Sequence, residues 1–311
     1  MAQNTRELRR RIKSTKSIRQ ITKAMEMIAA SKMRKAQLAA LSSRPYSVLA
    51  WEMLSSVAEK SEQFAGADAE LFYKFLSRGI KVNLNKELII LITSNRGLCG
   101  SLNSQLVNAA FSIVKNNKDT FDELSASKYS FIIVGRKGLR SALRLGLDVF
   151  ASYDGFENQP TFADTLPIAR SVMDSFAGGQ FKSVKLIYAD FISTLKYEIR
   201  VTQLLPINIE NEFATGKQPV VSRVEPAEFL FEPSPAEVLN SLIPRLIELQ
   251  VYQALVENLA SEHSARMVNM KNASDSARDI INDLTLTYNS VRQASITADL
   301  ADIIGGRMAV K

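Results

Sequence analysis

The stretch SNRGLCGSLNSQL, residues 94–106, is the part of the chain whose residue types are best suited to chemistry. It follows the apolar run ELIILIT and precedes good helix formers, and a turn from a strand into a helix is where α/β proteins bind phosphates. The stretch nevertheless contains neither GxGxxG nor GxxxxGK[ST]. We therefore interpret Arg96, Gly97 and Gly100 as parts of a structural turn, with phosphate binding as the less favoured alternative.

The chain has one histidine, His263, and one cysteine, Cys99, which leaves little material for a catalytic or metal centre. A single cysteine excludes an internal disulfide and a metal site with several thiolates. His263 falls on a periodic apolar stripe without a nucleophile or acid constellation around it. We expect a packing residue at His263, no catalytic residues, no metal and no cofactor.

Charge is distributed unevenly along the 311 residues, which carry a net +7 and are 46% hydrophobic. The first 40 residues hold eleven Lys or Arg against Glu7 and Glu26, whereas residues 235–311 hold seven basic and nine acidic groups. This pattern predicts an acidic partner surface. The cluster Arg9–Arg10–Arg11 could contact nucleic acid, but it lacks an aromatic platform or a recognition-helix pattern, so we expect none to bind.

The basic segment ITKAMEMIAASKMRKAQ, residues 21–37, is compatible with a targeting helix, a nucleic-acid arm, a calmodulin-type target or half of a coiled coil. It lacks the apolar core of a secretory signal, and its continuation into a longer helical pattern argues against removal as a presequence. The sequence contains no run of about 18 apolar residues, so we expect no membrane-spanning helix. The rest of the chain decides between these alternatives.

Residues 5–44 contain neither glycine nor proline and predict one long helix, with a bend near Pro45. Ile18, Ile21, Met25 and Ile28 have the spacing of a narrow apolar stripe. Five of the nine methionines suit either a helix seam or an adaptable binding face, and they stand at positions 25, 27, 33, 267 and 270.

The carboxyl-terminal segment predicts a second and longer helix. SPAE at 234–237 reads as a capping box, no glycine follows before Gly305, and Pro244 should kink or loosen the first turns. About 70 helical residues would span roughly 100 Å. A repeat of three and four residues runs through Leu239, Leu242, Leu246, Leu249, Gln253, Val256, Ala260, His263, Met267, Met270, Ser274, Ala277, Ile281, Leu284, Tyr288, Val291, Ser295 and Ala298.

The middle of the chain predicts an α/β domain with a mostly parallel sheet, because short β-branched runs alternate with helical stretches. We expect buried strands at 87–93, 129–135 and 184–190, an edge strand at 197–207, and helices near 103–115, 137–144 and 162–176. The chain ends should pair as an antiparallel two-helix coiled coil. The predicted domains are a coiled-coil helix at 1–60, a Rossmann-like α/β domain at 61–232 and a coiled-coil helix at 233–311.

Several motifs occur together, in one order: IRQITKAMEMIAASKMRKAQ (18–37), SSRPY (42–46), RGLCGSLN (96–103), QLLP (203–206), LFEPSPAEVL (230–239) and the long segment QVYQALVENLASEHSARMVNMKNASDSARDIINDLTLTYNSVRQASITADLADIIGG (250–306). With these motifs the chain resembles the gamma subunit of the rotary F-type ATP synthase over nearly its whole length. It departs from the family pattern at Asn95, where Asp is usual, at Ser101, where Gly is usual, at Pro244, and at the ending Gly305–Gly306–Arg307.

The resemblance implies a central-stalk rotor subunit without a catalytic site. Such a subunit transmits torque from the c-ring to the alpha3beta3 hexamer and so drives ATP synthesis coupled to proton transport. The implied partners are the alpha and beta subunits, the epsilon subunit and the c-ring. The implied location is peripheral, on the cytoplasmic side of a bacterial inner membrane. Met25 matches the position that faces the beta lever segment, and Arg292 and Gln293 match the pair that bonds an acidic beta loop.

Two other classes of function remain as alternatives. A coiled-coil adaptor or nucleic-acid-binding protein with an α/β head would bind DNA strongly and in a salt-sensitive way, without affinity for alpha or beta subunits. A hydrolase or nucleotide enzyme would need an active-site constellation that the residues do not provide. Arg292 and Gln293 could also be part of an ordinary solvated helix surface.

Overall fold

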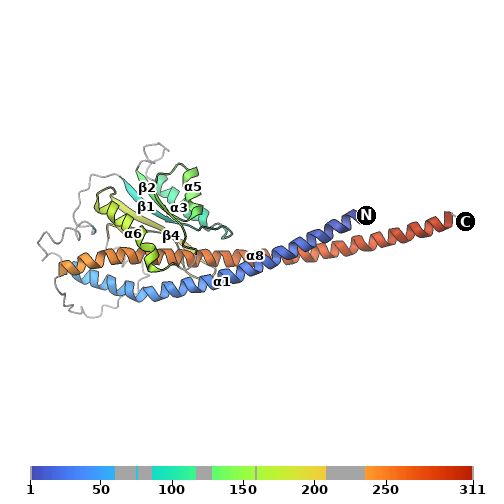
Figure 1. Ribbon diagram of the computed structural model, residues 1–311, viewed down its shortest axis with the longest axis horizontal. Coiled ribbons are helices and arrows are strands. Elements are labelled where there is room, and N and C mark those ends of the chain that lie inside the picture. Colours follow the sequence, from blue (N-terminus) through green and yellow to red (C-terminus); the bar gives the residue numbers. More distant parts are fainter. Residues whose placement is uncertain are drawn as a thin grey trace. The chain divides into compact units, whose positions relative to one another are not determined.

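A computed structural model describes residues 2–59, 75, 86–116, 128–157, 160–207 and 235–309 (Figure 1). Internal contacts divide the chain into two compact units: the terminal unit, residues 1–30 and 266–311, and the sheet unit, residues 31–265. Helix α1 (Ala2–Glu59) and helix α8 (Pro235–Ala309) each contribute one segment to both units. The division into segments 1–60, 61–232 and 233–311 remains a prediction.

The sheet unit contains five strands in the order β3-β2-β1-β4-β5, and all neighbours are parallel except β4 and β5. The predicted mostly parallel sheet is therefore confirmed, and the predicted edge strand is β5, which pairs antiparallel with β4. The strands are β1 (Glu87–Ile92), β2 (Tyr129–Val134), β3 (Val149–Tyr153), β4 (Ser183–Phe191) and β5 (Tyr197–Leu205), and the helices between them are α3 (Leu102–Asn116), α5 (Arg136–Arg144) and α6 (Phe162–Ala177).

Strand β3 was not predicted. Its five residues alternate between half-buried and exposed, and it lies at the outer edge of the sheet beside β2. The buried strands β1 and β2 consist mostly of consecutive apolar residues, which makes them far easier to recognise. An edge strand with only one neighbour lacks that signal.

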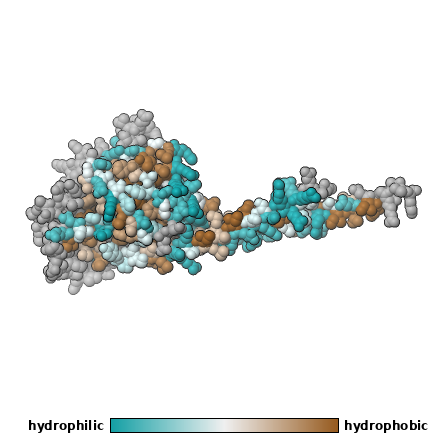
Figure 2. All heavy atoms as spheres, viewed as in Figure 1, coloured by the Kyte–Doolittle hydropathy of each residue, from teal (hydrophilic) through white to brown (hydrophobic). Residues whose placement is uncertain are grey.

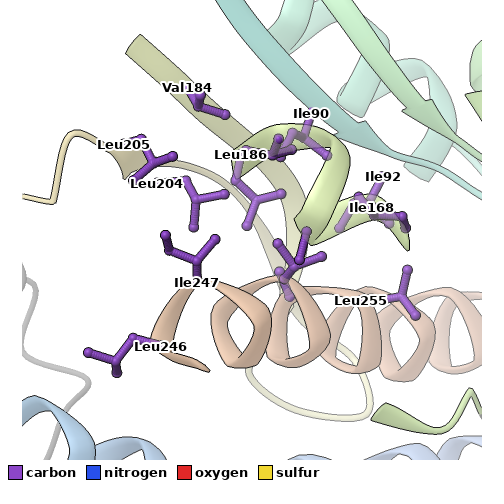
Figure 3. Packing of buried hydrophobic residues seen from close by; sticks show 14 of the residues in the cluster. Ile90, Ile92, Ile168, Val184, Leu186, Leu204, Leu205, Leu246, Ile247 and Leu255 are labelled. Atoms are coloured by element: carbon purple, nitrogen blue, oxygen red, sulfur yellow. The ribbon is translucent and has the colours of Figure 1, made fainter. Parts of the chain in front are cut away.

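Each face of the sheet is covered by its own set of helices. On one face, α6 and the parts of α1 and α8 that belong to the sheet unit pack against β1, β4 and β5. Figure 3 shows Ile247 and Leu255 of α8 directed toward Ile168 of α6 and the strand residues Leu186 and Leu204. The other face packs against α3 and α5 through Leu102, Leu106, Ala110 and Ala142. The sheet is thus buried on both sides, as parallel strands require.

Helix α6 begins with a capping box that the sequence reading missed. The backbone N–H and the hydroxyl of Thr161 both donate to the Asp164 carboxylate, each at 2.7 Å. These bonds hold the pKa of Asp164 below its ordinary value. The predicted cap residue of α8, Ser234, lies outside the described residues, as do Gly216 and Pro219, where we predicted a loop. Helix α8 does begin at Pro235.

The terminal unit joins the two ends of the chain, as expected for a helical pair. Helix α1 leaves this unit at Ala30 and α8 enters it at Arg266, so the two segments run in opposite directions (Figure 1). Within this unit the predicted stripe of α8 is buried or half-buried, and the residues between its positions are mostly exposed. The buried positions of this stripe in the unit are Met270, Ser274, Ala277 and Ile281.

The predicted apolar stripe of α1 is wrong for three of its four residues. Ile18, Ile21 and Ile28 are 51%, 59% and 57% exposed, and only Met25 is half-buried. The adjacent face carries the buried and half-buried positions instead. In this unit that face includes Leu8, Ile12, Thr15, Thr22, Glu26 and Ala29.

Two prolines that were expected to disturb the long helices lie inside continuous helix. Pro45 is an internal residue of α1 and Pro244 an internal residue of α8. The polar seam residue Gln253 also has a specific role, since its side-chain oxygen accepts a hydrogen bond from the Ser43 hydroxyl at 3.0 Å. This bond links α1 to α8 within the sheet unit.

Candidate partner interface

The terminal unit exposes an unusual number of large apolar side chains. Surface isoleucines and leucines occur singly on most soluble proteins, but an accumulation on one part of a molecule indicates an interaction surface. Figure 2 shows hydrophobic residues toward the carboxyl-terminal end of this unit. Those at least 49% exposed in the unit are Ile18, Ile21, Met27, Ile28, Ile280, Leu286, Ile296, Leu300, Ile303 and Ile304.

The whole net charge of the chain belongs to the same unit. Residues 1–30 and 266–311 contain fourteen Lys or Arg and seven Asp or Glu, whereas the sheet unit contains 25 of each kind. The α1 segment alone holds eight basic and two acidic residues, and the α8 segment holds six and five. One helix of the pair is therefore strongly positive and the other nearly neutral.

The three residues predicted to contact the partner all lie in the terminal unit, at two separate places. Arg292 and Gln293 are exposed neighbours on α8, next to the half-buried seam residue Val291. Met25 is half-buried on α1, close to Ala30, which is the last residue of the α1 segment in this unit. At 1.5 Å per residue, Met25 and Arg292 are about 30 Å apart along the helical pair. A partner role for each remains a prediction.

The loop after β1 is held by a compact hydrogen-bond network around Ser94. The Asn103 side-chain oxygen accepts from the Ser94 backbone N–H at 3.0 Å, and the Asn103 amide donates to the Cys99 sulfur at 3.2 Å. The Ser94 hydroxyl donates to the Arg96 carbonyl at 2.6 Å. Sequence reasoning missed Ser94 and Asn103, although polar residues at both ends of a glycine-containing turn are a detectable signal.

This loop also packs closely against the start of α5. The Thr93 hydroxyl accepts from the Gly138 N–H at 2.9 Å, and the Asn95 side-chain oxygen accepts from the Arg136 N–H at 3.0 Å. An aspartate at position 95 would also offer a side-chain oxygen as acceptor. A Cβ on Gly138 would lie 2.5 Å from the Thr93 hydroxyl oxygen, so the approach requires glycine.

The residues predicted to shape the loop are Arg96, Gly97 and Gly100. The Arg96 guanidinium forms an ion pair with Glu157 at 2.8 Å, and Gly97 lies near the Lys137 side chain. Gly100 has a φ of 64° in the left-handed region. The Ser94 N–H in this turn and the Arg136 and Gly138 N–H groups at the start of α5 are all bound to protein oxygens, so these three donors serve to hold the turn against α5. The structural role of Arg96, Gly97 and Gly100 stays a prediction with this support.

The other candidate residues are part of the core. His263 is 6% exposed and lines a small cavity of the sheet unit with Lys32, Lys35 and Leu259, and Cys99 is buried. Within the described ranges, no group of three or more His, Cys, Asp or Glu residues could hold a metal ion. Nor does any described helix combine enough length and apolar character to span a bilayer.

Comparison with known proteins accounts for nearly every residue. The ATP synthase family model matches residues 4–310. An ATP synthase gamma chain from Dehalococcoides mccartyi is 39% identical over 307 residues, with 99% of both chains covered. The gamma chain from Herpetosiphon aurantiacus is 36% identical over 312 residues, again with 99% of both covered.

Solved structures of ATP synthases have the same fold. A chain of the Tetrahymena thermophila mitochondrial ATP synthase central stalk and c-ring has a TM-score of 0.58 and 29% identity, and the match covers 82% of this chain and 99% of that one. A chain of the Euglena gracilis mitochondrial enzyme has a TM-score of 0.66 at 18% identity, over 100% and 95% of the two chains. The helical pair with its α/β sheet, the motifs of both chain ends and the full-length relatives agree: this chain belongs to the ATP synthase gamma chain family.

Proposed function

We propose that the chain is the rotor subunit of the central stalk of an F-type ATP synthase. It transmits torque from the c-ring to the alpha3beta3 hexamer and thereby drives ATP synthesis coupled to proton transport. Its own role is mechanical and non-catalytic, because nucleotide chemistry belongs to the beta subunits. Among the features of this chain, the one that carries the proposal is the terminal unit, which combines exposed apolar residues with all of the net positive charge.

The asymmetry of the terminal unit supplies a physical mechanism. A basic α1 segment beside a nearly neutral α8 segment makes the electrostatic surface different in each direction around the pair. As the pair turns, each beta subunit meets a different surface in succession. A ligand shifts a conformational equilibrium only through its differential affinity for the states, and this surface provides that difference. Each orientation of the rotor therefore favours a different beta conformation.

Three residues are proposed as direct contacts with beta. Met25 contacts the lever segment, where its flexible thioether side chain adapts to a moving surface. Arg292 and Gln293 reach an acidic loop, since an arginine fork suits a carboxylate and both side chains are exposed on α8. The excess of basic groups on α1 complements the acidic lever segment and steers assembly.

The sheet unit is proposed to engage the c-ring and the epsilon subunit. The chain is then a peripheral component of the enzyme on the cytoplasmic side of a bacterial inner membrane, attached through the Fo sector. No cofactor and no nucleic acid take part in this role. The equal numbers of basic and acidic residues in the sheet unit fit contacts that depend less on net charge.

Reconstitution with alpha and beta subunits tests the proposal. The chain should co-purify with an alpha3beta3 hexamer, and ATP hydrolysis by the assembled complex should rotate a label fixed to the sheet unit. Raised salt should slow assembly, because exposed charges are screened beyond about 10 Å at 0.1 M. Salt-sensitive DNA binding without affinity for alpha or beta would instead support the nucleic-acid alternative.

The variant Arg292→Ala/Gln293→Ala tests the outward contact. The free chain should keep its helix content, because both side chains are exposed, while the assembled complex should lose part of its coupling between rotation and catalysis. Arg278→Ala/Asn282→Ala removes exposed side chains from another part of the same helix and serves as the control. Normal coupling in the Arg292→Ala/Gln293→Ala complex would exclude the proposed contact.

A further inference from the structure

Three polar residues of α8 lie where a helix packed on a sheet would ordinarily be apolar. Asn258, Ser261 and Ser264 follow one another at intervals of three, and they are 1%, 0% and 3% exposed. Buried polar side chains are costly unless they are hydrogen-bonded. Each of these side chains is bonded to the backbone of another element, and we call the three the β4 clamp.

The β4 clamp binds the end of β4 and the turn that follows it. The Asn258 side-chain oxygen accepts from the Ala189 N–H at 3.0 Å, and the Ser261 hydroxyl donates to the Ala189 carbonyl at 2.9 Å. The Ser264 hydroxyl donates to the Thr194 carbonyl at 2.6 Å. Two residues of the helix therefore hold both polar groups of one strand residue, and the third holds the β4–β5 turn.

The location follows from the register of the sheet. Strand β1 pairs with β4 only as far as Leu91, which lies opposite Ile187. Strand β4 continues to Phe191, with β5 as its neighbour on the other side. Beyond Ile187, strand β4 no longer pairs with β1 along the edge that faces β1. The buried backbone groups on that edge need other hydrogen-bond partners. Helix α8 provides them through its side chains.

We infer that the β4 clamp fixes the rotational and axial position of α8 against the sheet, so that torque passes between them without slip. Apolar contacts are non-directional and resist rotation of a helix about its own axis only weakly. Hydrogen bonds weaken steeply when their angle falls below about 120°, so three bonds at two places along the strand and turn resist both rotation and sliding. Asn258, Ser261 and Ser264 are then positioning residues of the rotor. This inference rests on the proposed function.

Torsional stiffness in the assembled complex tests the inference. Arg140, exposed on α5, is replaced by cysteine and labelled with a rod, while the buried Cys99 is left in place. The angular fluctuation of the rod is then recorded while the complex pauses for lack of ATP. With Asn258→Ala/Ser261→Ala the variance of the angle should rise above that of the parent, whereas ATP hydrolysis without load should be unchanged.

A matched control separates the clamp from a general loss of stability. Thr165→Ala/Ser175→Ala also removes two buried hydrogen-bonding side chains, but these hydroxyls bond carbonyls of their own helix α6, at 2.8 Å to Phe162 and 2.7 Å to Ser171. Its angular variance should equal that of the parent. An unchanged variance in the clamp variant, or an equal increase in clamp and control variants, would overturn the inference.

Hydrogen exchange provides a second readout on the free chain. The Ala189 amide should exchange about tenfold faster after Asn258→Ala, because its buried N–H loses its acceptor. If the double variant does not fold, Ser264→Ala serves in its place and should raise the angular variance by a smaller factor. Failure of the parent chain to join the hexamer would refute the proposed function, whereas unchanged exchange at Ala189 would refute the clamp.

Discussion

The two units of this chain differ in how much of their apolar surface they bury. The sheet unit buries large aliphatic residues such as Ile90, Ile133 and Leu186 on both faces of its sheet. The terminal unit has a seam with small residues such as Ser274 and Ala277, and it leaves isoleucines such as Ile21 exposed. The first unit is stabilised by its own core, whereas the second leaves large apolar side chains exposed, and we propose that partner subunits cover them.

Charge divides in the same manner. The sheet unit is balanced at 25 basic and 25 acidic residues, and the terminal unit carries the net +7. Like charges on one slender unit repel one another and lower the stability of the free chain. Binding to an acidic partner would neutralise these charges and remove the repulsion between them. The difference teaches that composition averaged over the chain conceals a charge-balanced part with its own core and a basic part with exposed apolar residues.

The largest expected effect contrasts the two cores. Ile90→Ala, at a fully buried site of the sheet unit, should lower the free energy of unfolding by about 2–5 kcal/mol. Ile281→Ala, at a seam site that is 8% exposed, should cost about 1–2 kcal/mol, since fewer neighbours surround it. Urea unfolding followed by circular dichroism measures both. Equal losses would contradict the claim that the terminal unit lacks a comparable core.

A smaller effect is expected at the turn after β1. Gly138→Ala should cost about 1–3 kcal/mol, because its Cβ would lie 2.5 Å from the Thr93 hydroxyl oxygen. Gly97→Ala is the matched control, since the nearest atom to its Cβ would be 3.7 Å away, and its melting temperature should stay near that of the parent. A loss at Gly97 as large as that at Gly138 would show a tighter loop than these distances imply.

Little change in stability, but a clear loss of binding, is expected on the exposed apolar surface. Ile18→Gln/Ile21→Gln should change the unfolding free energy by no more than about 0.5 kcal/mol and weaken binding to alpha3beta3. Val201→Gln, at a 47% exposed site of the sheet unit, should leave hexamer binding intact. Titration calorimetry with the hexamer compares the two, and equal affinity would remove Ile18 and Ile21 from the interface.

The smallest effect is a shift in pH dependence within the sheet unit. The Ser130 hydroxyl donates to the Asp148 carboxylate at 2.6 Å and, with Lys86, lowers the pKa of Asp148. The contribution to stability is therefore present above the ordinary carboxyl pKa and is lost as pH falls through the lowered value. Ser130→Ala should raise the pKa of Asp148 and flatten the acid limb of the stability curve. Carbon-detected NMR titration would show it, and an unchanged pKa would leave Lys86 as the sufficient cause.

The success of sequence reasoning followed the completeness of burial. Strands β1, β2 and β4 are largely buried on both faces and were found, whereas β3 alternates at an edge and was missed. The seam of α8 was predicted correctly in the terminal unit, where the residues between the seam positions are mostly exposed. On α1 the most apolar stripe pointed outward, since a hydrophobic pattern reveals that a face is buried but not which molecule covers it.

The candidate sites show the same limit. Glycine at position 100 indicated a turn, and the residue has the positive φ that such a turn requires. The bonds from Asn258 and Ser261 to Ala189 could not be predicted, because they join residues about 70 positions apart through atoms of the backbone. Partner roles for Met25, Arg292 and Gln293 came from family resemblance, and exposure alone does not distinguish them from their neighbours.

The outward isoleucines have a consequence for biogenesis. The free chain exposes Ile18, Ile21 and Ile303 to solvent, and the alpha3beta3 hexamer of the proposed function would cover them. We expect free copies in excess to self-associate or to adsorb to anionic polymers, and balanced synthesis with the partner subunits to prevent this. The exposed isoleucines therefore link the solubility of the free chain to the supply of its partners.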